Sequence, residues 1–446
     1  MYLSILWHLH QPVYRNPEGG EYLLPWVNFH LTKNYYQMAF LAEEAGFPCT
    51  FNLVPCLLEQ IEDYCRGKAV DSIQGLLEAD PRKLNPTERE RLRRFLPPGT
   101  APSDPGKIQI LALRSFFSPV LKTGRHDKET LLDEQIRIRK KVIPYYKKLW
   151  QGGLVELTTS AYYHPLLPLI FDIRVGAETL MPAFRFAHPE DGKAQIRKGR
   201  EYFRHVFGRP PSGIWPSEGG ISLEVAAAMA AEGYAFAVTD ENILWKTLKR
   251  GPDTNLLYRP YASQDLVLFF RDRELSDLIS FEYWRWPEKD AVSHLLAKLE
   301  EKGRGCPPDA ICVIALDGEN PWAGYRENGV PFLRELYGRI LQRVDITPIF
   351  LEKYLALSKS PADLEIVSGT WLGGFSKWIG SPSKNAAWDV LTRTREECGP
   401  SEEMYIAEGS DWFWWFGEEN VAEFEALFRG YIKKACQAKK KRGSDV

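Results

Sequence analysis

The sequence predicts an α/β barrel built on a parallel sheet, and three observations lead to this fold class. Short apolar runs alternate with helix-patterned segments about seven times along the first 355 residues, which is the order that parallel strands with crossover helices produce. These runs show no polar alternation, as expected for strands buried on both faces. Each run ends in polar or aromatic residues or in proline. Because the carboxyl ends of parallel strands meet on one face of a barrel, this recurrence predicts one shared site.

Seven segments carry the strand pattern. The expected strands span residues 2–7, 49–54, 154–159, 213–215, 234–240, 266–270 and 310–316. Residues 347–350 form either a further edge strand or a strand that closes the barrel. Helical spacing over residues 31–45 ends at Gly46, and Ser222 is expected to cap a helix that ends at Gly233.

Two parts of the chain depart from the strand–helix alternation. Residues 57–151 are charged and helix-patterned, with a Pro/Gly-rich interruption at residues 97–106. We expect them to form a helical insertion, and a lid over the site is one interpretation of it. Beyond residue 355 the pattern is helical with aromatic loops. The sequence therefore predicts a barrel over residues 1–355 and a helical C-terminal domain over residues 356–446.

Composition excludes several classes of partner. Of the 446 residues 44% are hydrophobic and 26% are charged, as is ordinary for a soluble globular protein. The net charge of −2 provides no overall positive field for nucleic acid or an anionic membrane. The basic run at residues 439–442 lies at the C-terminus, where a solvated tail is expected. No apolar stretch is long enough to span a bilayer.

The N-terminus and the cysteines indicate the compartment. The first residues lack the basic region and small-residue cleavage site of a signal peptide. Seven cysteines form no CxxC and no zinc-like spacing, which favours reduced, buried thiols. We therefore expect a cytoplasmic protein, while the oligomeric state is not predicted.

Aromatic residues are abundant and often lie in polar surroundings. The chain has 14 Trp, 20 Tyr and 23 Phe, together 13%, and many of them stand beside Gly, Pro, Asp or Asn. Core packing explains most aromatic residues in most proteins. Flat rings beside polar loop residues also suit a sugar, whose C–H faces stack on aromatic rings while its hydroxyl groups need hydrogen-bond partners.

Two carboxyl residues are the candidates for chemistry. Asp317 ends the apolar run at residues 310–316, although an Asp-Gly turn is a common feature of strand ends. Glu218 follows a rigid Trp-Pro-Ser turn and precedes two glycines, although a glutamate near a helix start is also favoured by the helix dipole. Two such carboxyls facing a common axis can flank a glycosidic bond, where one attacks the anomeric carbon and the other protonates the leaving oxygen. A separation of roughly 5–5.5 Å gives retention of configuration, and a wider one gives inversion.

Other interpretations remain open from the residues alone. His8 and His10 could ligate a metal together with Asp317 or Asp240, as in a metal-dependent polysaccharide deacetylase, but the sequence has no HxxH or HxxxH pair at this point. They could equally bind substrate hydroxyl groups or satisfy core polar groups. A non-catalytic glycan-binding protein is a third possibility. The charged residues at 271–277 predict an ion-pair network that supports the site.

Five motifs occur in order along most of the chain. They are His8-Leu9-His10-Gln11-Pro12; residues 157–165; Gly213-Ile214-Trp215-Pro216-Ser217-Glu218; Ala315-Leu316-Asp317-Gly318-Glu319-Asn320; and a C-terminal set at residues 370–371, 377–380, 385–389 and 407–415. Together they resemble glycoside hydrolase family 57, and the C-terminal set resembles its amylopullulanase-like branch.

The resemblance implies a fold, a mechanism and site residues. The implied fold is a (β/α)7 barrel, an incomplete TIM-like barrel, with a helical C-terminal domain, and it agrees with the seven strands counted above. The implied mechanism is retaining and acts on α-glucans such as starch without a metal or an organic cofactor. By this resemblance Glu218 is the nucleophile and Asp317 the acid/base. The implied substrate-binding residues are His8, His10, His164, Trp215, Asp240, Arg271, Glu319, Trp378 and Trp388.

The sequence therefore predicts a retaining glycosidase that cleaves α-1,4, or also α-1,6, glucosidic bonds of glycogen or maltodextrin. No extra carbohydrate-binding module is evident, which favours an intracellular substrate over external starch. A 4-α-glucanotransferase and a glucan branching enzyme are alternatives on the same scaffold. The mechanism requires a protonated Asp317, whose pKa we expect burial and Glu218 to raise.

Overall fold

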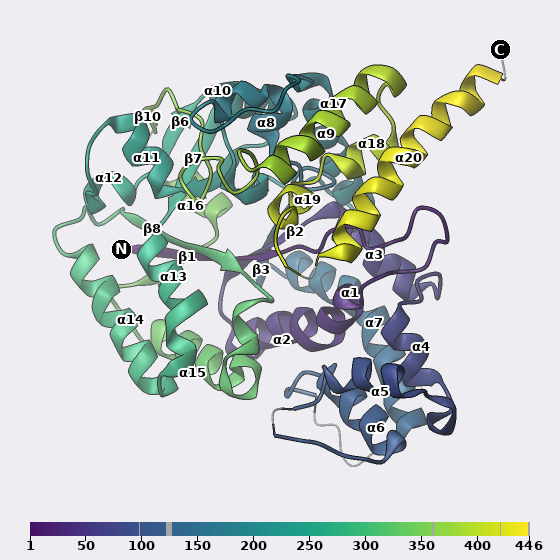
Figure 1. Cartoon of the computed structure of the whole chain (residues 1–446). Coiled ribbons are helices and arrows are strands. Elements are labelled where there is room, and N and C mark those ends of the chain that lie inside the picture. Colours follow the sequence, from purple (N-terminus) through teal and green to yellow (C-terminus); the bar gives the residue numbers. More distant parts are fainter. Residues whose placement is uncertain (98, 122–126, 359–360, 420, 445–446) are drawn as a thin grey trace.

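The computed structural model describes residues 1–97, 99–121, 127–358, 361–419 and 421–444, with side chains up to residue 437, and its centre is a barrel of seven parallel strands (Figure 1). The basic run at residues 439–442 therefore lies outside the described side chains. The barrel strands are β1 (Tyr2–Leu9), β2 (Cys49–Leu53), β3 (Val155–Thr158), β4 (Gly213–Ile214), β5 (Phe236–Asp240), β7 (Leu266–Arg271) and β8 (Ile311–Asp317).

Strand pairing confirms the predicted parallel barrel. β1 pairs with β2 and β8, β2 pairs with β3, β5 pairs with β4 and β7, and β7 pairs with β8, all in parallel. A single parallel bridge between Thr159 and Ile214 joins β3 to β4. The strands therefore follow one another around the ring in chain order, as right-handed strand–helix–strand units do.

Within the described residues, three short strands lie outside the ring. β9 (Thr347–Pro348) pairs with the start of β1, so the segment expected at residues 347–350 is an edge and does not close the barrel. β6 (Tyr261–Ser263) is antiparallel to β7, and β10 (Ala362–Asp363) pairs with β6. The sequence did not predict β6, because its turn uses Gln264 and Asp265 at positive φ (51° and 61°) where glycine or asparagine is the usual signal.

The barrel interior is layered by the alternation of side chains along each strand. Trp7 and its alternating neighbours on β1 pack outward against the helices, whereas Leu6 faces an inner cluster with Val238, Phe269 and Ala315. The next inward layer lies at the carboxyl end of the barrel and is mostly polar. Its members are His8, Asn52, Thr158, Trp215, Asp240, Arg271 and Asp317.

The opposite end of the barrel is closed by a helix. Leu351 and Tyr354 of α16 (Leu351–Leu357) belong to the inner apolar cluster. Glu156 of β3 accepts the backbone N–H groups of Leu351 at 3.2 Å and Glu352 at 2.8 Å. These are among the first amides of the helix, which have no partner within it. Glu156 therefore caps α16 from inside the barrel, at the end opposite the polar layer.

Helices surround the ring, and α2, α14 and α15 pack side by side below β1 and β8 in Figure 1. The helix expected at residues 31–45 begins earlier, as α1, and passes through a π-helical stretch at Leu31–Tyr35 before α2 ends at Gly46. The barrel helices are α1 (Trp26–His30), α2 (Tyr36–Ala45), α8 (Leu167–Phe171), α9 (Pro189–Phe207), α10 (Leu223–Ala231), α11 (Glu241–Leu248), α12 (Thr254–Leu257), α13 (Arg273–Asp277), α14 (Glu288–Gly303) and α15 (Val330–Leu341).

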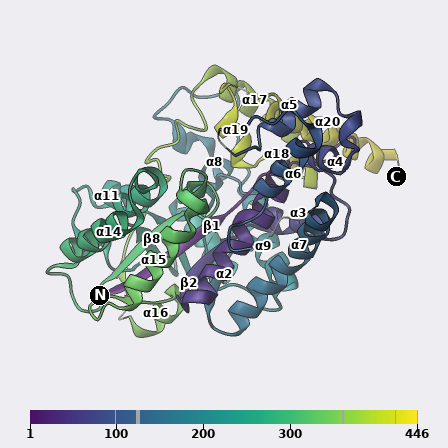
Figure 2. The same ribbon diagram turned by 90° about the horizontal axis from the view of Figure 1, so that it is seen from below.

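The predicted insertion and the C-terminal region are both helical. The insertion consists of α3 (Pro55–Cys65), α4 (Ser72–Glu78), α5 (Pro86–Arg93), α6 (Pro105–Ser115) and α7 (Lys128–Gln151). The C-terminal helices are α17 (Pro382–Cys398), α18 (Glu402–Ala407), α19 (Ser410–Trp415) and α20 (Ala422–Ser444). α4 to α6 form a lobe beside the barrel (Figures 1 and 2). Across the described ranges, no helix combines the length and apolar character needed to cross a membrane.

Candidate active site

Glu218 stands in a strained turn directly after β4. Its φ of 59° is in the left-handed region, which costs a non-glycine residue free energy and is retained where the surroundings enforce it. Those surroundings include the backbone N–H of Trp371, which donates to the Glu218 carbonyl at 3.0 Å, and the Ser410 hydroxyl, which donates to Oε1 at 2.9 Å. The Glu218 residue is only 8% exposed. The turn therefore holds the Glu218 side chain at the carboxyl end of the barrel.

Asp317 is the last residue of β8 and is half-buried. The Asn320 amide donates to its Oδ2 at 2.9 Å, and the Gly318 N–H donates to the His8 carbonyl at 2.7 Å. A side chain at position 318 would meet Leu9, because an added Cβ would lie 2.3 Å from Leu9 Cδ2. Asp317 can therefore precede a tight turn at Gly318 and still be a catalytic residue, because its side chain belongs to the inward layer of the barrel.

Electrostatics couples the two carboxyls. Burial raises the pKa of Glu218 to about 8, and the charges of Asp411 and Asp317 add to this rise. Burial also raises the pKa of Asp317, against the opposing effects of Asn320, His10 and Arg271. We expected Glu218 to raise the Asp317 pKa, but the stronger rise falls on Glu218, because it is the more deeply buried and faces two other carboxylates. Both carboxyls therefore hold a proton more tightly than exposed carboxyls do.

Three histidines stack beside the carboxyls. The His10 and His164 rings lie 3.9 Å apart, and His8 lies 5.2 Å from His164. His8 Nδ1 donates to Asn52 Oδ1 at 2.7 Å, since the Asn52 amide group donates elsewhere. Burial lowers the pKa of His8 to about 3 and that of His164 well below its usual value. Both rings are therefore neutral.

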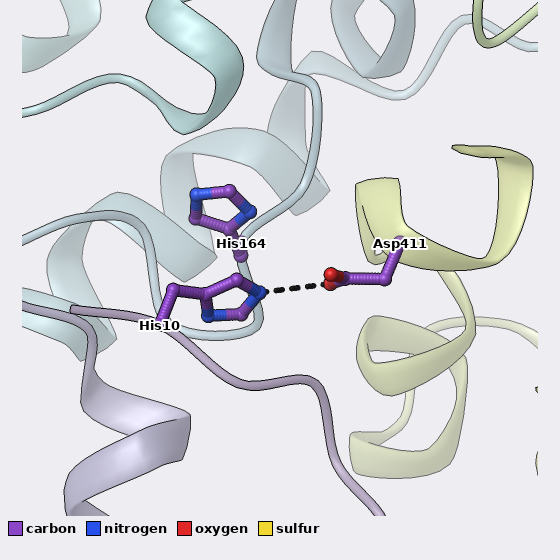
Figure 3. Close-up of side chains that lie close together, drawn as sticks. All are labelled: His10, His164 and Asp411. Carbon is purple, nitrogen blue, oxygen red and sulfur yellow. Dashed lines mark hydrogen bonds and ion pairs between the residues drawn. The ribbon is translucent and has the colours of Figure 1, made fainter. Parts of the chain in front are cut away.

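Two residues of α19 complete the site. Asp411 Oδ2 lies 2.9 Å from His10 Nε2 (Figure 3). This contact joins α19 to the segment that directly follows β1. Ser410 lies between His164 and Glu218, with its Oγ 3.0 Å from His164 Nδ1. Sequence reasoning placed residues 407–415 in a motif but gave neither residue a role. Their partners are far away in the chain, and only the motif itself could have indicated them.

One group of site residues has the composition of a metal site. The ligand atoms of His10, His164 and Asp411 lie within 4.8 Å of one another. In this arrangement the three side chains are held by hydrogen bonds. The His10 and Asp411 atoms point at each other in a hydrogen bond (Figure 3), and His164 Nδ1 faces Ser410. Metal ligands would need lone pairs that converge on a common third point.

Arg271 and Asp240 form the centre of the ion-pair network that the sequence predicts. Arg271 Nε lies 2.6 Å from Asp240 Oδ2, and Nη1 donates to the Ala315 carbonyl at 3.0 Å. Asp277 binds both Arg271 and Arg273. Asp240 is therefore neutralised by a guanidinium group, which also disfavours it as a metal ligand. The Arg271 guanidinium lies 5.5 Å from the ring of Trp371, a half-buried residue next to Glu218 to which sequence reasoning gave no role.

Four of the predicted substrate-binding residues lie below the surface of the structure. Trp378 and Trp388 are 0% and 1% exposed, and Trp388 stacks on Phe413 at 4.0 Å, so their rings build the core and are closed to a sugar. Glu319 is buried and accepts from the His10 backbone and the Tyr35 hydroxyl. Trp215 packs 5.6 Å from His8.

A parallel barrel with carboxyls from two strands at its carboxyl end is an arrangement that enzymes acting on glycosidic bonds use. Residues 4–359 match the family described as glycosyl hydrolase family 57. The chain belongs to this family and is an enzyme of the glycoside hydrolase type. Comparison with curated protein sequences finds no match.

Solved structures share the fold at low sequence identity. A family 57 branching enzyme from Thermococcus kodakaraensis has a TM-score of 0.66 and 18% identity, over 98% of this chain and 88% of that chain. An alpha-amylase from Thermotoga maritima has a TM-score of 0.65 and 17% identity, over 99% and 93%. A 4-alpha-glucanotransferase from Thermococcus litoralis has a TM-score of 0.62 and 16% identity, over 98% and 60%. These likenesses support the (β/α)7 fold.

Proposed function

We propose that the protein is a retaining α-glucan-active enzyme in which Glu218 is the nucleophile and Asp317 the acid/base. The observation that carries this proposal is the placement of a buried glutamate and a half-buried aspartate at the carboxyl end of the barrel, where the charge of Asp317 raises the pKa of Glu218. α-Glucan as the substrate is supported by family membership, and by structural relatives that are an amylase, a branching enzyme and a 4-alpha-glucanotransferase.

The proposed reaction has two displacements. Glu218 attacks the anomeric carbon while Asp317 gives its proton to the leaving glycosidic oxygen. Asp317 then removes a proton from the water or sugar hydroxyl that releases the glucosyl group. The first step requires an ionised Glu218 and a protonated Asp317, and burial, which raises the pKa of Asp317, favours the protonated form of that carboxyl. After the second step Asp317 is protonated again. The positive charge of Arg271 acts on this carboxyl and lowers its pKa.

His10 and Trp371 are the proposed contacts to glucose, because both are partly exposed beside the carboxyls. His8, His164, Trp215, Asp240, Arg271 and Glu319 lie behind them, and we propose that they hold this surface in place. Buried free thiols, such as Cys49, Cys56 and Cys312, agree with the proposed cytoplasmic location.

The test uses Glu218→Gln and Asp317→Asn on maltoheptaose and on glycogen. We expect kcat/KM to fall by about 10²–10⁴-fold for Asp317→Asn and by at least as much for Glu218→Gln, with the fold checked by circular dichroism. A near-normal rate in either folded variant would contradict the catalytic role proposed for the substituted residue. With the unaltered enzyme, oligosaccharides longer than the substrate would identify transfer, and shorter products alone would identify hydrolysis.

The alternative of a metal-dependent deacetylase makes a different prediction. Removal of metal ions by a chelator would abolish its activity, and zinc would restore it. The hydrogen-bonded arrangement of His10, His164 and Asp411, and the pairing of Asp240 with Arg271, favour the glycosidase.

A further inference from the structure

Two loops that are far apart in the chain meet behind Glu218. One follows β3 and ends in His164, and the other leads from α18 into α19 at Ser410. They pair through an antiparallel bridge between Pro165 and Gly409, and the Ser410 N–H donates to the His164 carbonyl at 3.0 Å. The Ser410 side chain is therefore fixed relative to the barrel by backbone contacts.

The direction of the hydrogen bonds at Ser410 follows from chemistry. When Glu218 is ionised, as the attack requires, its carboxylate only accepts, so the single Ser410 proton points to Oε1, 2.9 Å away. The Ser410 oxygen is then free to accept from His164 Nδ1, 3.0 Å away. His164 is neutral and thus carries one proton, which this arrangement places on Nδ1. His164 Nε2 is buried without a hydrogen-bond partner among the described residues, so nothing competes for that proton.

The frame around Ser410 leaves little freedom. An added Cβ at Gly409 would lie 3.0 Å from the Tyr163 carbonyl oxygen and 3.2 Å from that of Ile406, so the loop passes where only glycine fits without displacement. The Gln195 side chain joins the two loops, because it accepts from the Tyr163 N–H at 3.1 Å and donates to Glu408 at 2.7 Å. His164 itself is held at a φ of 56°. Such over-determined geometry is typical of groups that hold a reacting side chain.

The neighbouring Asp411 acts on Glu218 in the opposite sense. Its charge raises the Glu218 pKa, as does that of Asp317, whereas the hydrogen bond from Ser410 lowers it. The other groups around the Glu218 carboxyl are the neutral His164 ring at 3.9 Å and the Trp371 indole. Adjacent residues of one short helix thus oppose each other in setting the charge of Glu218.

We propose that Ser410 is a positioning residue for the nucleophile: its hydroxyl, aimed by His164, holds Oε1 of Glu218 and leaves Oε2 as the oxygen that attacks. Asp411 provides the opposing charge and anchors His10. The C-terminal helical region therefore takes part in the chemistry of the barrel. This inference rests on the proposed role of Glu218 as the nucleophile.

The experiment measures the pH dependence of kcat/KM on maltoheptaose for Ser410→Ala and Asp411→Asn. Glu218 must be ionised to attack, so of the two limbs of the profile its pKa governs the one at lower pH. Loss of a hydrogen bond to a charged group is expected to shift this limb upward by about one pH unit and to lower kcat by about 10- to 100-fold in Ser410→Ala. In Asp411→Asn, which still accepts a hydrogen bond from His10, the same limb is expected to move to lower pH. Ser4→Ala removes a buried hydroxyl without a described partner and is the matched control.

A merely structural role of α19 would not move one pH limb in opposite directions in two adjacent variants. A Ser410→Ala enzyme with the limb and kcat of the unaltered enzyme would overturn the inference, while an inactive Glu218→Gln in the same series would leave the proposed function standing. Activity in Glu218→Gln would contradict both the proposed function and the inference about Ser410. If Ser410→Ala does not fold, Asp411→Asn decides, and an unmoved limb in that variant overturns the proposal.

Discussion

At the scale of single residues, the site depends on where polar side chains fall in the two-residue period of a strand. Asp240, Arg271 and Asp317 each end an apolar strand on its inward side, so the last layer of the barrel interior is charged. The sequence predicted these residues because each strand changes there from apolar to polar. It could not predict the pairing of Arg271 with Asp240, since that depends on the register between β5 and β7.

Removal of the guanidinium in Arg271→Met is expected to leave Asp240 buried without a cation. Breaking a buried pair in this way costs about 3–5 kcal/mol of unfolding free energy. The double variant Arg271→Met/Asp240→Asn removes both charges and should recover most of that loss. Urea unfolding of the three proteins measures both effects. Equal stability of the single variant and the unaltered protein would show that the pair contributes nothing.

At the scale of elements, the sequence predicted the strands and helices that begin or end at the usual capping and turn residues. Gly46 ends α2 in the left-handed conformation, and the Ser222 hydroxyl caps α10, as expected. The hairpin of β6 and β7 escaped prediction because Gln264 and Asp265 adopt positive φ only under tertiary constraint. The cap of α16 by Glu156 escaped it because an apolar strand gave no sign that its one carboxylate reaches across the barrel.

Glu156 should make stability depend on pH. Burial raises its pKa to about 7 from the usual 4.5, so the folded protein binds the proton more tightly than the unfolded chain. The resulting stabilisation is fully present below about pH 4.5 and is lost as pH rises to about 7, by about 3 kcal/mol.

Denaturant unfolding at several pH values compares the unaltered protein with Glu156→Gln, which cannot titrate. The difference in unfolding free energy between the two proteins should change across this pH range. Parallel curves would contradict the role given to Glu156.

At the scale of the whole molecule, the barrel and the C-terminal helices both contribute side chains to the candidate site. The buried Arg395 of α17 binds Asp191 of α9 through two nitrogens, at 2.5 and 2.9 Å, and this contact joins the two regions behind the loops that hold His164 and Ser410. The sequence predicted the barrel and the helical region, and the catalytic roles of both carboxyls stay predictions. It also predicted sugar contacts for Trp378 and Trp388, whose rings are buried in the structure. A tryptophan in a polar motif has the same sequence signal whether it faces a sugar or the core.

The central claim is that Glu218 forms a covalent bond to the sugar and that Asp317 serves both half-reactions. An α-maltosyl fluoride needs no proton on its leaving group, so Asp317→Asn should still form the ester between Glu218 and C1 as fluoride departs, but should hydrolyse it slowly. Intact-protein mass spectrometry should show the added maltosyl group, and peptide mapping should place it on Glu218. The double variant Glu218→Gln/Asp317→Asn should remain unlabelled. An adduct on another residue, or fluoride release by Asp317→Asn at the full rate with no adduct, would contradict the account.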